Sequence, residues 1–149
     1  MRYLPELANS AWADATVQQT LDMTTGVKYA EDFADPTSGV FQYLAAAGLQ
    51  PARPGSNGAK SMAEHLPTVQ KDGEHGTGFA YKSVDTEVLG WLLQRVTGKS
   101  YATLLSERIW SKLGTQEDAY VFADANGGQA TSVGVNATLR DLGLSLIHI

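Results

Sequence analysis

The stretch GFAYKSVDTEVLGWLLQRVTG, residues 78–98, carries the clearest helix pattern in the chain. Ser83 can accept hydrogen bonds from the backbone N–H groups that a helix start leaves free. Asp85 and Glu87 place negative charge in the first turn, where the helix dipole favours it. The apolar face comprises Val84, Val88, Leu89, Trp91, Leu92 and Val96, and Gly98 follows as a left-handed stop. We therefore expect a helix over residues 83–97.

The chain beyond this stretch repeats the pattern of a capped helix. Ser100 can cap a second helix, and Gly114 can end it. Its apolar residues recur at helical spacing, at Tyr101, Leu104, Leu105, Ile109 and Leu113. We expect the two helices to form a hairpin.

Weaker patterns divide the rest of the chain. They predict short helices over residues 16–23, 40–48 and 61–69, loops over residues 28–39 and 51–58, and a strand over residues 119–123. Helices dominate, and one or two strands do not make a complete sheet. The sequence thus predicts a mainly α chain that is the helical part of a larger fold.

The composition is that of a soluble globular domain. The 149 residues are 43% apolar and 18% charged, which suits one core with a solvated surface. The net charge of −5 disfavours nucleic acid as a partner, and no apolar run approaches the ~18 residues of a membrane span. Without cysteine, neither disulfides nor a thiolate zinc site can form. No feature decides between bacterial cytoplasm and periplasm.

Histidine and acidic residues do not form a metal-binding pattern. His65 and His75 are ten positions apart, whereas a zinc site needs three or four convergent ligands. The glycines of GEHGTG, residues 73–78, do not lie between a strand and a helix as dinucleotide binding requires. The acidic residues at positions 31–35 are expected to form a solvated loop. We therefore expect neither a metal nor another cofactor.

Tyr81, two residues before the expected helix, is either a packed aromatic or a catalytic base. A phenol has a pKa of about 10 and acts as a base only when cations or hydrogen bonds stabilise the phenolate. Lys82 is its neighbour, but neighbouring side chains of an extended segment point in opposite directions. A helping ammonium group has to come from elsewhere. Spacing alone favours the packed aromatic.

The same stretch resembles the second motif of the penicillin-recognising serine hydrolases, the superfamily of class C β-lactamases, DD-peptidases and related esterases. The matching residues are Phe79, Tyr81, Ser83, Leu89, Gly90, Val96, Thr97, Gly98 and Tyr101. Further segments are similar in the same order: RYLPEL, LDMTTGVKY, WSKLG, a Gly-Gly pair and T-x-R-D-L. Tyr-x-Ser, LDM and EDFADP are most similar to the 6-aminohexanoate-dimer hydrolase branch. The resemblance implies that residues 1–143 are a partial domain, the helical subdomain of an α/β fold whose sheet is largely missing.

The resemblance also implies a reaction, acyl transfer through a serine ester, with a small-molecule amide or ester as substrate. Tyr81 then corresponds to the general base and acid. Ser83 corresponds to a residue that holds the substrate or the catalytic lysine, where most relatives have asparagine. Phe33 corresponds to a position that looks like a tyrosine in the dimer hydrolases. The hydroxyl of that tyrosine can donate a hydrogen bond to the leaving amide nitrogen, and phenylalanine has no such donor. We therefore expect the parent enzyme to prefer esters, or other amides, to the linear amide dimer of 6-aminohexanoate.

Two motifs of that superfamily do not occur in these 149 residues. One is Ser-x-x-Lys, which supplies the nucleophile and the lysine, and the other is the C-terminal Lys-Thr-Gly or His-x-Gly. We expect the chain to be an inactive part of a larger serine hydrolase. The alternative is a non-catalytic helical module that binds a protein partner through an exposed apolar face.

The last six residues, LSLIHI at positions 144–149, break the amphipathic pattern that precedes them. In one reading frame, the transposon-end adapter of sequencing libraries translates to the same letters. We therefore interpret these residues as a non-native tail and give His148 no role in any mechanism. The alternative is a native apolar strand, which would favour aggregation because it has no charge and no proline.

Overall fold

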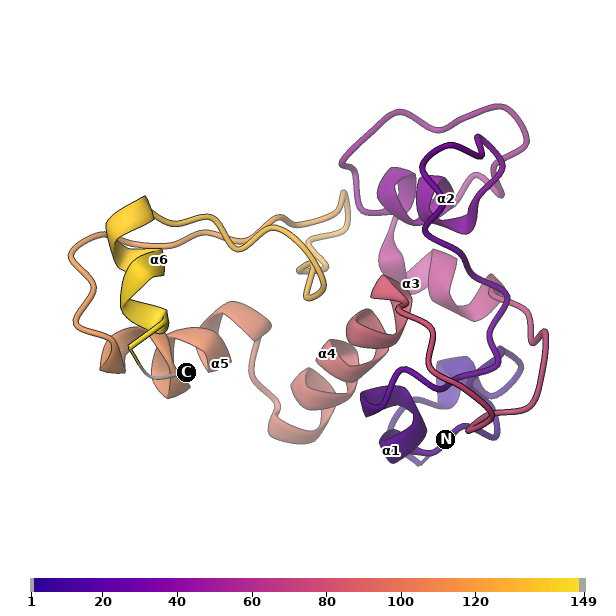
Figure 1. The fold of residues 1–149 in the computed structure, drawn as a ribbon, viewed down its shortest axis with the longest axis horizontal. Coiled ribbons are helices and arrows are strands. Elements are labelled where there is room, and N and C mark those ends of the chain that lie inside the picture. Colours follow the sequence, from indigo (N-terminus) through magenta and orange to yellow (C-terminus); the bar gives the residue numbers. More distant parts are fainter. Residues whose placement is uncertain (1, 148–149) are drawn as a thin grey trace.

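Helices joined by long loops make up residues 2–147, the part of the chain that this computed structural model describes (Figure 1). In order they are η1 (Pro5–Leu7), α1 (Val17–Leu21), α2 (Gly39–Ala46), α3 (Met62–His65), η2 (Leu66–Thr68), α4 (Ser83–Thr97), α5 (Tyr101–Arg108), η3 (Trp110–Lys112) and α6 (Leu139–Ser145). Within residues 2–147 the β pairing is limited to isolated bridges, Val27 with Lys71, Tyr120 with Asn136 and Ala123 with Gln129. The prediction of a mainly α chain is confirmed.

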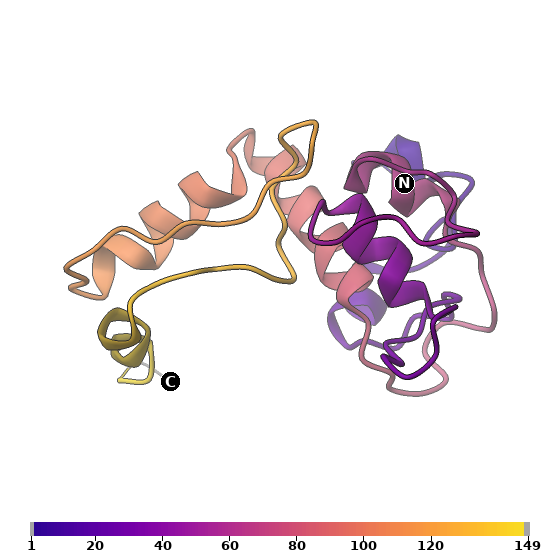
Figure 2. The ribbon, with the colours of Figure 1, turned by 90° about the horizontal axis from the view of Figure 1, so that it is seen from above.

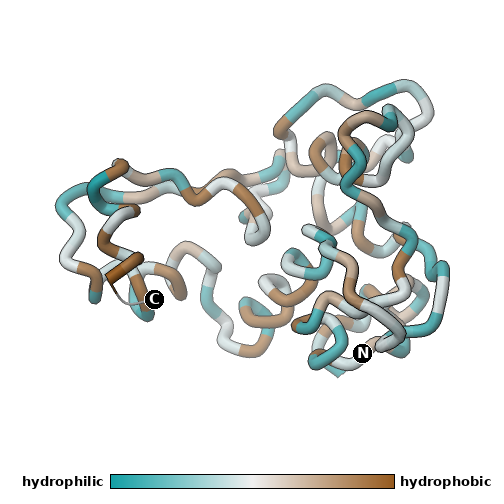
Figure 3. Tube along the Cα trace, viewed as in Figure 1, coloured by the Kyte–Doolittle hydropathy of each residue, from teal (hydrophilic) through white to brown (hydrophobic). Residues whose placement is uncertain are grey.

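The molecule has a packed part and an extended part. The elements from η1 to α4 surround the core, whereas α5 and α6 lie away from it in both views (Figures 1 and 2). Among residues 99–147 only Asp124, Ala130 and Asp141 are buried. Hydrophobic residues nevertheless occur on α6, far from the core (Figure 3). Within residues 2–147 no helix combines the length and the apolar character that crossing a membrane requires.

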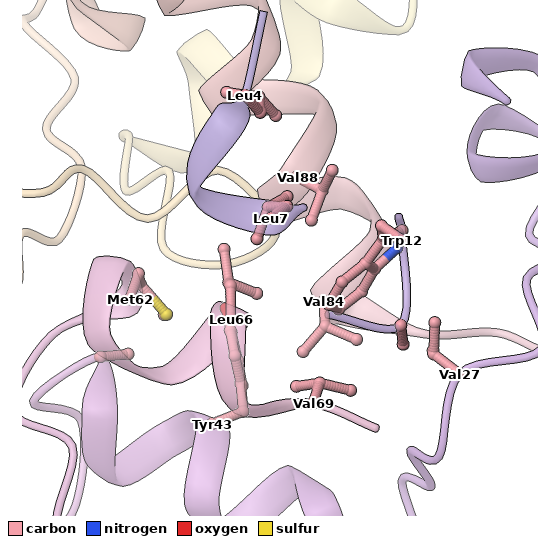
Figure 4. Packing of buried hydrophobic residues seen from close by; sticks show 12 residues of the cluster. Leu4, Leu7, Trp12, Val27, Tyr43, Met62, Leu66, Val69, Val84 and Val88 are labelled. Atoms are coloured by element: carbon pink, nitrogen blue, oxygen red, sulfur yellow. The ribbon is translucent and has the colours of Figure 1, made fainter. Parts of the chain in front are cut away.

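The core lies between the N-terminal segment, α2, the α3–η2 pair and the first half of α4 (Figure 4). Trp12 and Tyr43 are its largest side chains, followed by leucines such as Leu66, and none of these three is more than 2% exposed. Val84 of α4 is fully buried among them, whereas Val96 near the other end of α4 is 57% exposed. Burying one such apolar side chain contributes about 1.5–3 kcal/mol. The core therefore fixes the start of α4 rather than its end.

Helix α4 has the predicted limits and ends at Gly98, whose φ of 67° is left-handed. The prediction that Ser83 is the N-cap is wrong. Lys82, with an extended backbone, is the N-cap residue, and Ser83 is the first residue in the helix. The N–H of Ser83 donates to Oε1 of Glu31 at 2.6 Å. A carboxylate from a distant loop therefore serves as the anion at this helix start.

The predicted short helices are present with changed limits. Thr16 caps α1 and forms a capping box with Gln19, so that helix begins one residue later than predicted. Helix α2 ends at Ala46. The helix predicted over residues 61–69 is two elements, α3 and η2, because Pro67 has no N–H to continue the α-helical bonds.

The second helix is shorter than predicted, and the predicted hairpin is wrong. Ser100 caps α5, but the helix ends at Arg108 because Ile109 has non-helical angles, φ −126° and ψ −67°. The element η3 follows it. Helix α5 leads away from α4 (Figures 1 and 2), and none of its residues is buried. The apolar faces of the two helices therefore do not pack along their lengths.

The predicted strand over residues 119–123 is also wrong. Tyr120 and Ala123 form only single bridges, to Asn136 and Gln129. A lone two-stranded ribbon is marginally stable, and no third segment pairs with this one among residues 2–147.

Helix α6 includes the first two residues of the predicted tail, Leu144 and Ser145. Thr138 caps the helix, and the carboxylate of Asp141 accepts the N–H groups of Gln116 and Glu117 at 3.1 and 3.0 Å. The T-x-R-D-L segment thus ties α6 to the turn after η3. Residues 148 and 149 lie outside the described residues, so the interpretation of a non-native tail stays a prediction.

Candidate active site

The approach to α4 is joined by backbone hydrogen bonds to the segment that follows α1. The N–H of Gly76 donates to the carbonyl oxygen of Thr24 at 2.7 Å, and the N–H of Ala80 donates to that of Met23 at 2.9 Å. The second bond lies one residue before Tyr81. The backbone that carries the candidate base is therefore held against a second segment rather than free in a loop.

Tyr81 and Lys82 point to opposite sides, as the extended approach predicts. The Tyr81 side chain is 57% exposed, whereas Lys82 is only 5% exposed. The Lys82 ammonium group donates to the carbonyl oxygen of Thr25 at 2.9 Å, on the inner side of the segment. Lys82 consequently gives the phenol no direct hydrogen bond.

Ser83 is buried, and Tyr29 and Glu31 from the loop before α2 lie beside it. The hydroxyl of Tyr29 is buried and has no hydrogen-bond partner among the described residues. Burial, followed by the negative charge of Glu31, raises the pKa of Tyr29 above its usual value. Tyr29 therefore stays protonated at neutral pH and offers an unused donor close to Ser83.

The loop predicted at residues 28–39 is present up to residue 38, since Gly39 begins α2, but its acidic residues are not simply solvated. Glu31 binds the first N–H of α4, and two residues later Phe33 is 65% exposed. The Phe33 ring packs edge-on against Phe41 of α2, with centroids 6.0 Å apart. The bond between Glu31 and Ser83 thus brings the Phe33 loop to the start of α4. Phe33 and Tyr81 are both exposed, whereas Ser83 is buried.

Asp85, in the first turn of α4, is a buried carboxylate whose role in this site the sequence did not indicate. Asp85 has no exposed surface, and its two oxygens accept from Nε1 of Trp12 at 2.8 Å and Oγ1 of Thr25 at 2.7 Å. Burial raises the pKa of Asp85, and these hydrogen bonds oppose the rise. The first-turn position of Asp85 suggested only an interaction with the helix dipole. No sequence spacing points to its partners, which are 60 and 73 residues away.

Glu87 is a second buried carboxylate on α4. It accepts the hydroxyl of Tyr43 at 2.8 Å and the N–H groups of Thr131 and Ser132 at 3.0 and 2.9 Å. The hydroxyls of Thr131 and Ser132 also donate to it, each at 2.9 Å. Glu87 therefore connects α2, α4 and the segment around residue 131, and its oxygens are occupied by the protein itself.

The two histidines considered from the sequence have structural surroundings. Nδ1 of His75 accepts the N–H of Gly26 at 2.9 Å, so Nε2 carries the proton toward Asp14 at 3.1 Å. His65 is 3% exposed in the packed part, and burial lowers its pKa to about 4. Among residues 2–147 no three His, Asp or Glu side chains converge as ligands of one metal ion.

A pocket of about 530 Å³ lies beside the second half of α4, away from Tyr81. Its lining includes Trp91, Gln94 and Asp124. Oε1 of Gln94 accepts the N–H of Tyr101 at 3.2 Å, and Oδ2 of Asp124 accepts the N–H of Met62 at 2.9 Å. Because these polar groups already serve the fold, we place the candidate site at the start of α4 and not in this pocket.

The comparison with protein families agrees with this reading of the chain. The family model described as Beta-lactamase matches residues 1–144. The chain belongs to the beta-lactamase family. The predicted serine hydrolase family is thereby confirmed.

Two relatives of this beta-lactamase-family chain carry the same name. A 6-aminohexanoate-dimer hydrolase from Paenarthrobacter ureafaciens is 40% identical over 141 residues, which are 94% of this chain and 35% of the relative. A solved structure from Bacillus anthracis, provisionally named a 6-aminohexanoate-dimer hydrolase, has a TM-score of 0.83 at 34% identity. The structural match covers 97% of this chain and 38% of the chain in that solved structure. The similarity to that branch is confirmed, and the chain spans little more than a third of the length of either relative.

Proposed function

We propose that this beta-lactamase-family chain is part of a serine hydrolase that cleaves an amide or ester bond of a small molecule. One observation carries the proposal beyond family membership: Tyr81 is an exposed phenol on a backbone held at the start of α4. In this reaction a serine Oγ attacks the carbonyl carbon, and its proton passes to the base. The amine or alcohol then leaves with a proton, and water hydrolyses the acyl-serine.

Tyr81 is the proposed base and acid of these proton transfers. Its phenolate needs a nearby cation, and the ammonium group of Lys82 lies on the opposite side of the backbone. We assign that role to the lysine of a Ser-x-x-Lys motif in a longer protein, which also supplies the nucleophile. Ser83 is proposed to hold the substrate or that lysine through its hydroxyl. Ser83 is only 4% exposed, which favours the lysine, because a side chain of the same protein can occupy an enclosed position that a diffusing substrate cannot easily reach.

Phe33 is the proposed determinant of substrate choice. Its exposed ring offers apolar contact without a hydrogen-bond donor, so an amide nitrogen leaving beside it gains no stabilisation there. We predict that the longer enzyme hydrolyses esters faster than the linear amide dimer of 6-aminohexanoate, and that Phe33→Tyr raises kcat/KM for the amide about tenfold. Equal rates on the amide and a matched ester, unchanged by Phe33→Tyr, would contradict this role.

A covalent serine probe tests the hydrolase proposal itself. A fluorophosphonate reacts with activated serines and not with ordinary ones. We expect it to label the longer protein at the serine of Ser-x-x-Lys and to leave the Ser→Ala variant of that residue unlabelled. Absence of labelling in a folded wild-type protein would count against the proposal.

The alternative function is a non-catalytic helical module that binds a protein partner. The observation in its favour is a pair of exposed apolar side chains on α6: Leu139 is 87% exposed and Leu142 is 53% exposed. The DNA upstream of Met1 separates the two functions. An open frame encoding Ser-x-x-Lys shortly before RYLPEL supports the hydrolase, and a stop codon directly before Met1 supports the module.

A further inference from the structure

Lys82 is a buried lysine that the proposed reaction does not use. Its side chain is 5% exposed, and its ammonium group donates to the carbonyl oxygen of Thr25 at 2.9 Å and to that of Ala80 at 3.4 Å. Removing an ammonium group from water costs several kcal/mol unless other groups compensate the charge. The immediate surroundings of Lys82 must therefore provide that compensation.

Thr25 connects Lys82 to a buried negative charge. Its carbonyl oxygen accepts from Lys82, while its hydroxyl donates to Oδ2 of Asp85 at 2.7 Å. The other carboxylate oxygen accepts Nε1 of Trp12 at 2.8 Å. Trp12, Asp85, Thr25 and Lys82 thus form one chain of hydrogen bonds, and none of these four residues is more than 5% exposed. The ammonium and the carboxylate offset each other across a single threonine.

Three successive attachments define the backbone around Tyr81. The N–H of Ala80 is bound to Met23, the side chain of Lys82 is bound to Thr25, and the N–H of Ser83 is bound to Glu31. Tyr81 is the residue between them that faces outward. Since the Lys82 side chain must enter the core to reach Thr25, the extended backbone turns the Tyr81 side chain to the opposite side.

We propose that Lys82 is a positioning residue for Tyr81. Its buried ammonium group fixes the extended backbone just before α4, and this fixes the direction in which the phenol projects. The consequence for catalysis rests on the proposed function, whereas the fixation of the backbone concerns this chain alone. Lys82 takes no part in proton transfer.

Hydrogen exchange of the 149-residue chain tests the fixation. In Lys82→Met, which keeps the apolar stem and removes the charge, we expect the amides of Ala80 and Ser83 to exchange at least about tenfold faster. The amide of Ala11, bound to Val69 at 2.9 Å in the packed part, should change less than about twofold. The control Lys28→Met removes an exposed lysine and should leave all three amides unchanged. Equal acceleration at all three amides in Lys82→Met, or none, would overturn the proposal.

The absence of cysteine allows a specific rescue. Lys82→Cys can be alkylated under denaturing conditions with 2-bromoethylamine, which recreates a lysine-like ammonium group, and then refolded. We expect exchange at Ala80 and Ser83 to return to within about twofold of the unmodified chain. Alkylation with iodoacetamide, which adds a neutral group, should leave it fast. Equal rescue by both reagents would show that side-chain volume rather than charge acts here, and would overturn the proposal.

Kinetics of the longer enzyme test the consequence for catalysis. If Lys82 only directs Tyr81, Lys82→Met lowers kcat about tenfold or more and changes KM less than about twofold. A raised KM with unchanged kcat would contradict a positioning role. If Tyr81→Phe has no effect on the rate while the exchange results hold, the proposed role of Tyr81 as base fails and the fixation of the backbone by Lys82 stands.

Discussion

At the scale of single residues, polar groups inside the packed part determine the geometry of the candidate site. Glu31 caps α4 from a distant loop, and Asp85 and Glu87 each tie α4 to other segments. Leaving such a group without its partner costs about 1–3 kcal/mol. The start of α4 is thus held both by apolar packing and by hydrogen bonds that specify one arrangement.

His65 makes stability depend on pH in a definite direction. Burial lowers its pKa to about 4, compared with 6.5 in an unfolded chain. Between these values the unfolded state binds the proton more readily, so the free energy of unfolding falls as the pH drops from about 6.5 to about 4. At pH 4.5 the loss is about 2–3 kcal/mol.

Urea unfolding of the wild type and His65→Leu at pH 7 and pH 4.5 measures this contribution. The variant has no titratable group at position 65. Its free energy of unfolding should therefore fall by about 2–3 kcal/mol less than that of the wild type between the two pH values. Equal decreases in the two proteins would show that His65 does not titrate as its burial requires.

Some of this residue detail was accessible from the sequence and some was not. The opposite orientation of Tyr81 and Lys82 followed from the alternation of an extended segment. The capping of α4 by Glu31 did not, because its 52-residue separation from Ser83 leaves no local pattern. Hydrogen bonds that close over such distances depend on the whole fold.

At the scale of elements, Gly90 shows how closely α4 approaches the segment around residue 131. A Cβ at position 90 would overlap the side chain of Thr131. Alanine favours a helix over glycine by about 1 kcal/mol, but such overlap costs about 1–3 kcal/mol or more. We therefore expect Gly90→Ala to lower the free energy of unfolding by about 1–2 kcal/mol in denaturant titrations.

A matched control is Gly143→Ala in α6, where an added Cβ would meet nothing within 4 Å. Here the higher helix propensity of alanine acts without a steric clash, so the substitution should stabilise α6 by about 0.5–1 kcal/mol. If Gly90→Ala were also stabilising, the close contact between α4 and Thr131 would be wrong.

The limits of a long helix were predicted best where the core covers part of its apolar face. Helix α4 has a terminal glycine and an apolar face whose first half the core covers, and its predicted limits hold although Ser83 is not its N-cap. Helix α5 has a comparable pattern, yet none of its residues is buried and it ends early. An amphipathic pattern indicates that one face of a helix packs against another part of the protein, but it does not identify that part.

At the scale of the whole molecule, packing is unequal along the chain. Nearly all buried side chains lie before residue 99, and α5 and α6 extend away from that core. The family membership predicted from motif order is confirmed by a match to residues 1–144. Motif order was informative because it samples the whole chain, whereas each motif alone was loose.

This inequality predicts a weakly cooperative thermal transition for the 149-residue chain. We expect a broad melt by circular dichroism, with the amides of α5 exchanging faster than those in the first half of α4, because few buried contacts hold α5. A single sharp transition with uniform protection would show that the two parts unfold together and that this description of the packing is wrong.

The role of Tyr81 in a serine hydrolase is tested most directly by the rate of serine acylation. In the longer enzyme, Tyr81→Phe keeps the ring and removes only the hydroxyl, so binding and folding should change little. We predict that the mutant reacts with a fluorophosphonate and with an ester substrate about 10²- to 10⁴-fold more slowly than the wild type, the usual effect of lost acid–base catalysis. An unchanged acylation rate would remove Tyr81 from the mechanism.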